Sequence, residues 1–332
     1  MQISPLKQTL PSAETPLVTV EDLRVRFRSR DFNVPVVNGV SFSLGKGEVL
    51  CLLGESGSGK SVTMRALMRL FPSTAVVSGK INVDGHDILG LSRSKLRAIR
   101  GAVVSMIFQE PMTSLDPVFT IGSQIAESVM FHEGASRRQA ELRALELLEL
   151  VQVPSAKRRL IAYPHELSGG LRQRAMIALA LACRPKLLLA DEPTTALDAT
   201  VQIQILLLLR ELQHELGMAT IFVTHDLGVA CEVADRVAVM YAGRFVEQGS
   251  ITQVMDNPSH PYTQGLLRST VHEGVRGVRL ETIPGSPPDL AELPAGCSFA
   301  PRCGFVRPDC TMAVPHDATV GQGHSARCVL VG

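Results

Sequence analysis

The residues with the clearest chemical meaning lie between Gly54 and Ser61, where the chain reads GESGSGKS. Two glycines separated by four residues and followed by Lys-Ser have the spacing of a phosphate-binding P-loop. Glycines let the backbone bend until successive N–H groups point at one anion, and the start of a helix adds partial positive charge. Lys60 is suited to the β- and γ-phosphates, and the Ser61 hydroxyl to magnesium. We predict that the whole loop binds a nucleotide: Gly54, Glu55, Ser56, Gly57, Ser58, Gly59, Lys60 and Ser61.

A second nucleotide signal is the segment LLLADEP, residues 187–193, in which four apolar residues precede Asp191 and Glu192. Both carboxylates would emerge at the carboxyl end of a buried strand, which is the edge where sheets of this type bind ligands. A strand that simply ends in two exposed acids is the plainer alternative. Because a P-loop is present in the same chain, we predict that Asp191 holds magnesium and that Glu192 activates water.

A third segment, LSGG, residues 167–170, precedes an alanine-rich helical stretch. Ser168, Gly169 and Gly170 would present a hydroxyl and free N–H groups at the positive end of a helix dipole, which makes a second anion site. Two glycines at a helix start can also be a simple turn. Since one compact subunit would hold its two anion sites apart, we expect two subunits to face each other head to tail. Each would then give its Ser168 loop to the γ-phosphate bound by the other.

Apolar patterns predict the elements that must position these residues. Short apolar runs predict strands at 17–20, 23–27, 36–44, 49–53, 79–83, 103–108, 187–190 and 220–224, and a hairpin of strands 237–240 and 244–247. Helical spacing predicts helices at 121–130, 136–151 and 200–217. In the second of these, Leu142, Leu145, Leu148 and Val151 form the expected buried stripe behind Ser136, a predicted N-cap. Strands that alternate with helices around a P-loop favour an α/β fold with a mostly parallel sheet and helices on both faces.

With these motifs in this order, the chain resembles the ATP-binding cassette (ABC) ATPases from residue 17 to about residue 249. Gln109 in IFQEP matches the Q-loop of the family, residues 196–198 its D-loop with Asp198, and His225 in FVTHD its switch histidine. Phe27 matches the aromatic residue that stacks on adenine. The resemblance implies that Gln109 contacts magnesium and the attacking water, and that His225 contacts the γ-phosphate and helps to orient Glu192. Leu171 departs from the usual Gln after the second glycine of LSGG, which puts the neighbouring polar contacts in doubt.

The resemblance also implies the domain organisation. We expect a P-loop NTPase fold of the ABC ATPase type, with a mostly parallel sheet core, an antiparallel β subdomain and a helical subdomain. The expected boundaries are a flexible tail at 1–16, the ATPase domain at 17–255 with its helical subdomain at about 110–183, and a small irregular C-terminal extension at 256–332.

Four cysteines, Cys297, Cys303, Cys310 and Cys328, lie in the C-terminal extension with five, six and seventeen residues between them. Four thiols in a glycine- and proline-rich segment fit one tetrahedral thiolate site, holding either an iron–sulfur cluster or zinc. The spacing lacks a CxxC pair, so zinc is the weaker match. Residues 257–267 and 283–290, followed by GCSFAPRC, resemble the extension of oligopeptide and dipeptide importer ATPases, which implies a [4Fe-4S] cluster, with zinc next and free thiols as the last alternative. We expect a structural role, since nothing nearby suggests a redox partner.

Composition excludes several other classes of protein. The chain has 332 residues, of which 45% are hydrophobic and 20% charged, and a net charge of +1, so it gives no electrostatic case for nucleic acid as a partner. Its longest apolar stretches fall short of the ~20 residues that a bilayer span needs. The first ten residues lack the pattern of a secretory signal, so we expect a cytoplasmic protein without structural disulfides. Cys51, Cys183 and Cys231 lie in apolar segments and are expected in the core.

The resemblance therefore predicts the ATP-hydrolysing subunit of a membrane importer of peptides or a related small solute, with ATP and Mg²⁺ as ligands. It implies as partners a second ABC ATPase subunit (a copy or a paralogue), two membrane-spanning permease subunits and an extracytoplasmic substrate-binding protein. The chain would lie peripherally on the cytoplasmic face of the membrane. The alternative is a soluble ABC ATPase that acts on nucleic acid or ribosomes, although such proteins usually carry two cassettes or strong basic patches. A scaffold without turnover is a third possibility, and the intact Asp191, Glu192 and His225 speak against it.

Overall fold

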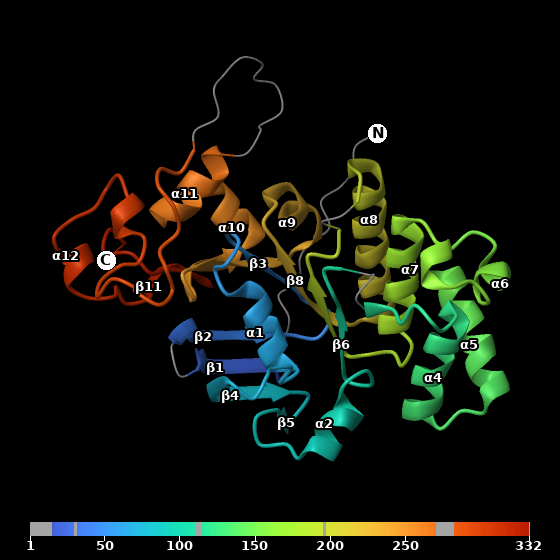
Figure 1. Ribbon diagram of the computed structural model, residues 1–332. Coiled ribbons are helices and arrows are strands. Elements are labelled where there is room, and N and C mark those ends of the chain that lie inside the picture. Colours follow the sequence, from blue (N-terminus) through green and yellow to red (C-terminus); the bar gives the residue numbers. More distant parts are fainter. Residues whose placement is uncertain (1–14, 30–31, 111–113, 195–196, 270–281, 332) are drawn as a thin grey trace.

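The computed structural model describes residues 15–29, 32–110, 114–194, 197–269 and 282–331. Two sheets form the centre of this part of the chain, with the antiparallel one below the main sheet in Figure 1. A group of helices lies at one side of the main sheet and the C-terminal segment at the other. These layers confirm the α/β fold of an ABC ATPase that the sequence predicts.

The main sheet has eight strands in the order β11-β12-β10-β9-β3-β8-β7-β6. The neighbours from β9 to β6 pair in parallel, and β10, β12 and β11 pair antiparallel. Successive side chains of β7 point to opposite faces: Leu188 and Ala190 pack in one core cluster, Leu187 and Leu189 in another. The sheet is thus buried on both faces. Its strands are β3 (Val49–Leu53), β6 (Val104–Ile107), β7 (Leu187–Asp191), β8 (Ala219–Thr224), β9 (Arg236–Tyr241), β10 (Arg244–Ser250), β11 (Ala318–Gly321) and β12 (His324–Ala326).

The second sheet is antiparallel, in the order β2-β1-β4-β5. Its strands are β1 (Val18–Arg28), β2 (Asn33–Leu44), β4 (Ala75–Val83) and β5 (His86–Asp87). The two short strands predicted at 17–20 and 23–27 form one long strand, β1. The prediction missed the continuity because polar Glu21 and Asp22 interrupt the apolar pattern, and Asp22 takes a positive φ of 46° where the register with β2 shifts between Val20 and Leu23.

Five described helices each follow a strand of one of the two sheets: α1 (Lys60–Leu67), α2 (Arg93–Ile99), α8 (Ala199–Leu216), α9 (Leu227–Val233) and α10 (Ile251–Asp256). The helix α1 begins directly after the P-loop, and its Met64 and Leu67 are buried in the same cluster as Leu50 and Leu52 of β3. The predicted strand–loop–helix order around Gly54–Ser61 is confirmed.

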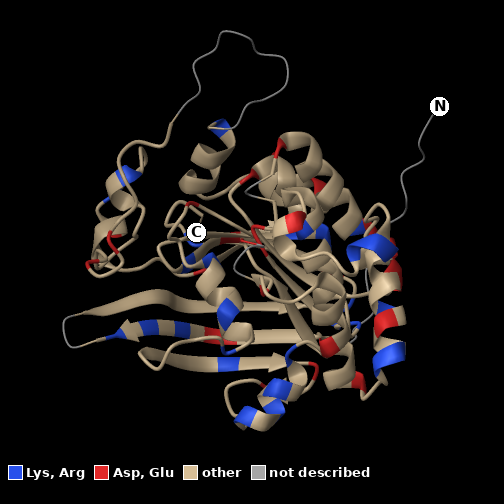
Figure 2. Cartoon of the chain, turned by 45° about the vertical axis from the view of Figure 1, so that its right-hand side comes forward, with Lys and Arg blue, Asp and Glu red and all other residues tan. Residues whose placement is uncertain are grey.

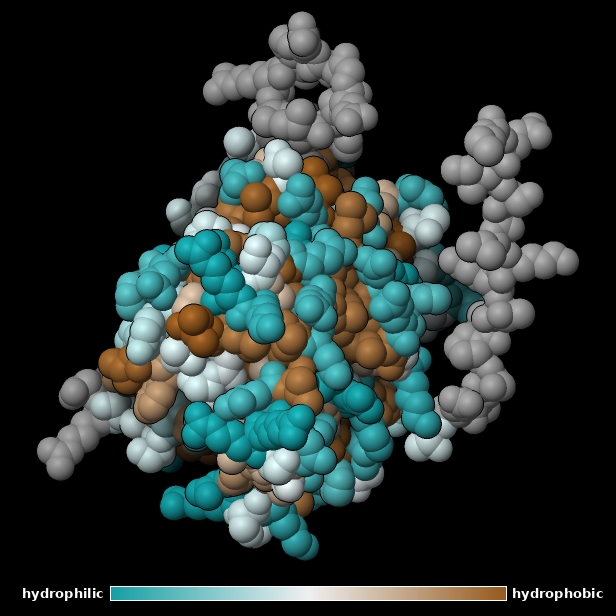
Figure 3. All heavy atoms as spheres, turned by 90° about the vertical axis from the view of Figure 1, so that its right-hand side faces the viewer, coloured by the Kyte–Doolittle hydropathy of each residue, from teal (hydrophilic) through white to brown (hydrophobic). Residues whose placement is uncertain are grey.

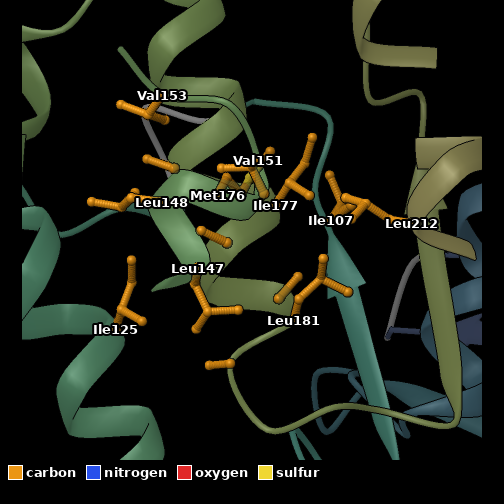
Figure 4. Packing of buried hydrophobic residues seen from close by; sticks show 14 of the residues in the cluster. Ile107, Ile125, Leu147, Leu148, Val151, Val153, Met176, Ile177, Leu181 and Leu212 are labelled. Carbon is orange, nitrogen blue, oxygen red and sulfur yellow. The ribbon is translucent and has the colours of Figure 1, made fainter. Parts of the chain in front are cut away.

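A helical group follows β6 and consists of α4 (Ile121–Glu133), α5 (Arg137–Leu150), α6 (Ala156–Arg159) and α7 (Gly169–Ala180), with a 3₁₀ turn at Pro164–Glu166. Ser136 caps α5 as predicted and forms a capping box with Gln139. Figure 4 shows Leu147 and Leu148 of α5 packed between Ile125 of α4 and Ile177 of α7. The predicted stripe is partly wrong, because Leu142 is 55% exposed and the buried face of α5 carries Ala140 and Ala144 in its place.

The segment after α10 contains α11 (Pro261–Arg268), a 3₁₀ turn at Ala300–Arg302 and α12 (Asp309–Met312) before its two strands join the main sheet. Glu247 of β10 is buried and accepts hydrogen bonds from Ser259 N at 2.7 Å and His260 N at 2.9 Å. It also lies 2.8 Å from Nε2 of the buried His324 on β12. One carboxylate thus joins three separate stretches of chain.

All seven cysteines are free thiols. Cys51 is buried as expected, whereas Cys231 is exposed on α9, where Leu227, Val229, Ala230 and Val233 face the core. The expectation that Cys231 lies in the core is therefore wrong. No helix among the described residues is both long and apolar enough to cross a bilayer.

Candidate active site

The P-loop is shaped by backbone that other residues cannot easily adopt. Gly54 has φ +151° and Gly59 has φ +105°. A Cβ atom at Gly59 would lie 2.7 Å from the carbonyl oxygen of Val36, and one at Gly54 would meet the carbonyl of Met240. The ammonium of Lys60 donates to the carbonyls of Gly54 at 2.6 Å and Glu55 at 2.9 Å, across the loop. Glycine is required here for both conformation and space.

A cavity of about 530 Å³ lies over the P-loop. Its walls come from the loop and the start of α1, from Val36 of β2 and from residues that follow β6, β7 and β8, which brings the predicted Gln109, Glu192 and His225 to one place. The lining residues are Val36, Glu55, Ser56, Gly57, Ser58, Gly59, Lys60, Ser61, Val62, Gln109, Glu192 and His225.

Ser61 and Asp191 lie at the base of this site. The Ser61 hydroxyl donates to Asp191 Oδ1 at 2.8 Å, although 130 positions separate the two residues in sequence. Asp191 is 3% exposed, and burial raises its pKa while the hydrogen bond from Ser61 lowers it. Two oxygen ligands on adjacent elements, one of them a carboxylate, fit the preference of Mg²⁺ for oxygen.

Glu192 is held between two polar partners. Its Oε2 accepts from Gln109 Nε2 at 3.3 Å, and its Oε1 lies 3.4 Å from His225 Nδ1. The backbone of Glu192 takes a positive φ of 44°, and its N–H donates to the carbonyl of Val223 at 3.1 Å. Gln109, Glu192 and His225 follow β6, β7 and β8, so the carboxyl edge of the parallel sheet brings them together.

The charge state of Lys60 depends on the same acids. Burial lowers the pKa of the Lys60 ammonium, and the carboxylates of Glu192 and Asp191 raise it. The site thus combines a buried cation, a loop of backbone N–H groups and a pair of acids. Such an arrangement can bind a polyphosphate with its metal and position water beside a carboxylate.

The LSGG loop lies outside the cavity over the P-loop. Ser168 caps α7 by accepting a hydrogen bond from Leu171 N at 3.4 Å, so the predicted helix start is present. Ser168 and Gly169 are exposed, and neither lines the cavity over the P-loop. The loop lies beside the start of α8, because a Cβ at Gly170 would be 3.0 Å from Val201 and one at Gly169 3.6 Å from Leu197. This chain keeps its two predicted anion sites apart.

Two further predicted residues also lie outside the cavity. Phe27 is half-buried and its ring packs edge-on against Phe71, with centroids 6.1 Å apart. Asp198 is exposed and caps α8 by accepting from Val201 N at 3.0 Å. Ala196, which belongs to the same predicted D-loop, lies outside the described residues. The roles of Phe27 and Asp198 stay predictions.

Sequence reasoning missed two neighbours of the P-loop. Val36 lines the cavity, but it belongs to an apolar strand in which nothing distinguishes it from its neighbours. Arg302 from the C-terminal segment binds the carboxylate of Glu55. No local pattern predicts this contact, because it joins residues 247 positions apart.

The four C-terminal cysteines line one small enclosed cavity together with His260 and Phe299. Cys303 Sγ accepts from the N–H of Phe305, and Cys310 Sγ from that of Arg307, each at 3.4 Å. Burial raises the pKa of Cys297 and Cys328, and backbone N–H groups next to each thiol lower it. These N–H groups would stabilise thiolates. Across the residues that the structure describes, no group of three or more His, Cys, Asp or Glu side chains is arranged to hold a metal ion.

Comparison with known proteins agrees with both parts of the chain. The family model described as ABC transporter matches residues 37–195. The model described as oligopeptide/dipeptide transporter, C-terminal region, matches residues 246–310.

Full-length relatives are similar over nearly the whole chain. The oligopeptide transport ATP-binding protein OppD of Salmonella typhimurium is 47% identical over 318 residues, covering 96% of this chain and 95% of that protein. The protein of the same name from Haemophilus influenzae is 47% identical over 315 residues, covering 95% of this chain and 97% of its own length.

A solved structure shares the fold of the ATPase part. It is a dimeric ATP-binding cassette, MJ0796, in a post-hydrolysis state with ADP and phosphate, at a TM-score of 0.64 and 29% identity. The match covers 70% of this chain and 98% of that one. From these matches and from the site, the chain belongs to the ABC transporter ATP-binding proteins of the oligopeptide/dipeptide importer type.

Proposed function

We propose that this chain binds and hydrolyses ATP to power the uptake of peptides, or a related small solute, by a membrane importer. The observation that carries the proposal is the convergence of Lys60, the Ser61–Asp191 pair and Glu192 around one cavity. The C-terminal match favours the oligopeptide/dipeptide branch, and the OppD proteins that resemble the whole chain are named for oligopeptide transport. These similarities speak against the alternative of a soluble ATPase acting on nucleic acid or ribosomes.

The geometry supports a division of labour in hydrolysis. The P-loop N–H groups and Lys60 would bind the β- and γ-phosphates. Ser61, Asp191 and Gln109 would hold Mg²⁺, which would supply positive charge next to the phosphates. Glu192 would accept the proton of the attacking water. Gln109 and His225 contact the two different oxygens of Glu192, so they fix the orientation of its carboxylate. Phe27 would stack on the adenine.

A second ATPase subunit completes the site in this proposal. Ser168 and Gly169 are exposed and Gly170 is half-buried, and none of the three lines the cavity of its own chain, which leaves them available to the nucleotide of a partner. Asp198 lies at the start of the adjacent α8 and would face the same interface. The resembling cassette MJ0796 was solved as a dimer with ADP and phosphate.

Permease subunits would dock near the helical group, on the cytoplasmic face of the membrane. Large apolar side chains are exposed close to Gln109 in sequence and along α4, among them Phe119 and Phe131 at more than half their surface. Figure 3 shows apolar patches on the side of the molecule that carries this group. Figure 2 shows basic and acidic residues interspersed over the sheets and helices. An apolar contact with a membrane subunit fits this surface better than a nucleic-acid partner does.

We further propose that Cys297, Cys303, Cys310 and Cys328 hold a [4Fe-4S] cluster. The four thiols line one enclosed cavity and have neighbouring backbone N–H donors, which stabilise thiolates. The sequence favours a cluster over zinc, because it lacks a CxxC pair. The cluster would supply a structural cross-link.

The transport function is tested by expressing the tagged chain with its natural membrane partners. Co-purification of permease subunits and ATP-dependent uptake of labelled peptides into vesicles are the expected results. Stimulation of ATPase activity by RNA or ribosomes, with no permease bound, would establish the alternative.

The cluster is tested by anaerobic purification. We expect iron and sulfide in equal amounts and a visible absorption band that bleaches on reduction. Cys310→Ser should lose the band, whereas the control Cys231→Ser, an exposed cysteine outside the cavity, should keep it. Zinc content without sulfide would overturn the cluster.

A further inference from the structure

The carboxylate of Glu55, the second residue of the P-loop, is bound by a side chain from the C-terminal segment. Arg302 donates from Nη1 to Glu55 Oε2 at 2.8 Å and from Nη2 to Glu55 Oε1 at 3.0 Å. Two parallel N–H···O bonds form the geometry in which a guanidinium binds a carboxylate most strongly. The pair therefore fixes the plane of the Glu55 carboxylate as well as its position.

This ion pair is shielded from solvent. The side chain of Arg302 is 6% exposed and that of Glu55 is 25% exposed. Two further Arg302 donors are also satisfied, because Nε donates to the carbonyl of Pro284 at 2.8 Å and Nη1 to the hydroxyl of Tyr241 at 3.2 Å. Loss of one partner would leave the other charge buried without its counterion, which is costly.

The backbone of Glu55 is held from the same side. Its N–H donates to the hydroxyl of Tyr262, on α11, at 2.9 Å. Tyr262 is fully buried, and its ring packs against Tyr241 and Phe299 with centroids 4.6 Å and 5.3 Å apart. The segment after α10 thus holds Glu55 through both its main chain and its side chain.

Glu55 lies where β3 turns into the phosphate-binding loop. Its carbonyl, together with that of Gly54, accepts from the ammonium of Lys60. A shift of Glu55 would therefore move the carbonyls that orient Lys60 and change the entry of the loop. This contact gives the C-terminal segment a direct influence on the nucleotide site.

The backbone of the same arginine lies between two of the four cysteines. Arg302 ends the 3₁₀ turn Ala300–Arg302, which lies between Cys297 and Cys303. The turn is closed at both ends, because Ala300 N donates to the carbonyl of Cys297 at 3.0 Å and Cys303 N to that of Ala300 at 3.3 Å. Whatever holds these two thiols in place therefore also holds the backbone of Arg302.

We propose that Arg302 is a positioning residue for the P-loop, through which the four-cysteine segment sets how tightly the chain binds nucleotide. The inference rests on the proposed function, because it requires that the P-loop bind ATP. It assigns to the C-terminal segment a role in the nucleotide site of its own chain.

The test is a titration of the purified full-length chain with a fluorescent ATP analogue. We expect Arg302→Gln to weaken binding roughly 10-fold, the scale of a hydrogen bond to a charged group, and the conservative Arg302→Lys to restore part of the loss. Glu55→Gln should weaken binding similarly, and the double variant should be no weaker than either single variant, because one contact is lost in all three. Arg138→Ala removes an exposed arginine of α5 and should match the wild type.

A second arm tests the connection to the cysteines. Cys303→Ser should weaken analogue binding several-fold, and the addition of Arg302→Gln should not weaken it further. Cys231→Ser should bind as the wild type does. Thermal melting of each variant is measured in parallel, so that a change in affinity is separated from a loss of folded protein.

Wild-type affinity for Arg302→Gln, with a lowered melting temperature, would overturn the inference and leave a purely structural ion pair. Losses that multiply in the double variant would overturn it as well. Failure of the proposed function looks different, because the wild type and Lys60→Ala would then both fail to bind the analogue. If the wild type binds the analogue, Lys60→Ala weakens that binding and Arg302→Gln leaves it intact, the inference alone is rejected.

Discussion

The chain carries two loops that place small residues at a helix N-terminus, and their surroundings differ sharply. In the P-loop, Lys60 and Ser58 are buried, and strands of both sheets and the C-terminal segment enclose the loop. In the LSGG loop, Ser168 is exposed, and among the described residues Leu197 and Val201 at the start of α8 lie nearest its glycines. The first loop is shaped within its own chain to bind phosphate. The second is presented outward, which is the form expected of a half-site that another subunit completes.

The largest expected effect comes from removing the carboxylate beside the P-loop. Glu192→Gln should keep ATP binding and slow hydrolysis by ~100-fold or more, the scale of losing a positioned base. The measurement is phosphate release by the assembled transporter together with analogue affinity of the subunit. The control is Glu211→Gln, an exposed glutamate of α8. Near-normal turnover of Glu192→Gln would contradict the proposed chemistry.

Lys60→Ala tests the P-loop itself. We expect roughly 10- to 100-fold weaker ATP binding, because the variant loses the buried cation that we propose binds phosphate. Equilibrium titration of the isolated subunit gives the affinity. Lys46→Ala, an exposed lysine in the turn before β3, should bind as the wild type does. Equal ATP affinities of Lys60→Ala and Lys46→Ala would contradict the proposal that the P-loop binds the nucleotide through Lys60.

Ser168→Ala tests the exposed LSGG loop. In the isolated chain ATP affinity should stay unchanged, whereas turnover by the assembled transporter should fall roughly 10-fold through the loss of a hydrogen bond to phosphate. Ser136→Ala is a matched control, since Ser136 caps α5 in the same way and lies outside both loops. If Ser168→Ala weakens ATP binding by the isolated chain, the loop serves its own subunit and the proposed division is wrong.

The last prediction concerns stability rather than activity. Gly59→Ala should cost about 1–3 kcal/mol of folding free energy, because alanine at φ +105° is strained and its Cβ meets the Val36 carbonyl. Gly169→Ala should have little effect on folding, since Gly169 has no positive φ and an added Cβ would make only an ordinary contact with Leu197. Chemical denaturation of both variants compares the two loops directly. A larger loss for Gly169→Ala would show that the LSGG loop is the more constrained one.

The sequence places several predicted site residues that meet at one cavity, because they are contiguous or follow buried strands. Gln109, Glu192 and His225 each come directly after or near the end of a parallel strand, and the carboxyl edge of the sheet collects them. The burial of residues that pack between helices was harder to predict. Leucines occur on both sides of α5, so periodicity placed Leu142 in the core, although small Ala140 and Ala144 occupy that face. The Arg302–Glu55 contact carries no local signal at all.

The pairing of β12 with β10 has a consequence for how the molecule behaves when it is shortened. A chain cut before Ala318 would lose β11 and β12 and expose the row of unpaired N–H and C=O groups along β10, including those of Glu247 and Gln248. Such an open edge is a template for joining another chain, so the shortened protein is expected to aggregate. It would also leave the buried carboxylate of Glu247 without its contact to His324. The strands β11 and β12 thus cover the β10 edge of the main sheet and keep it from pairing with another chain.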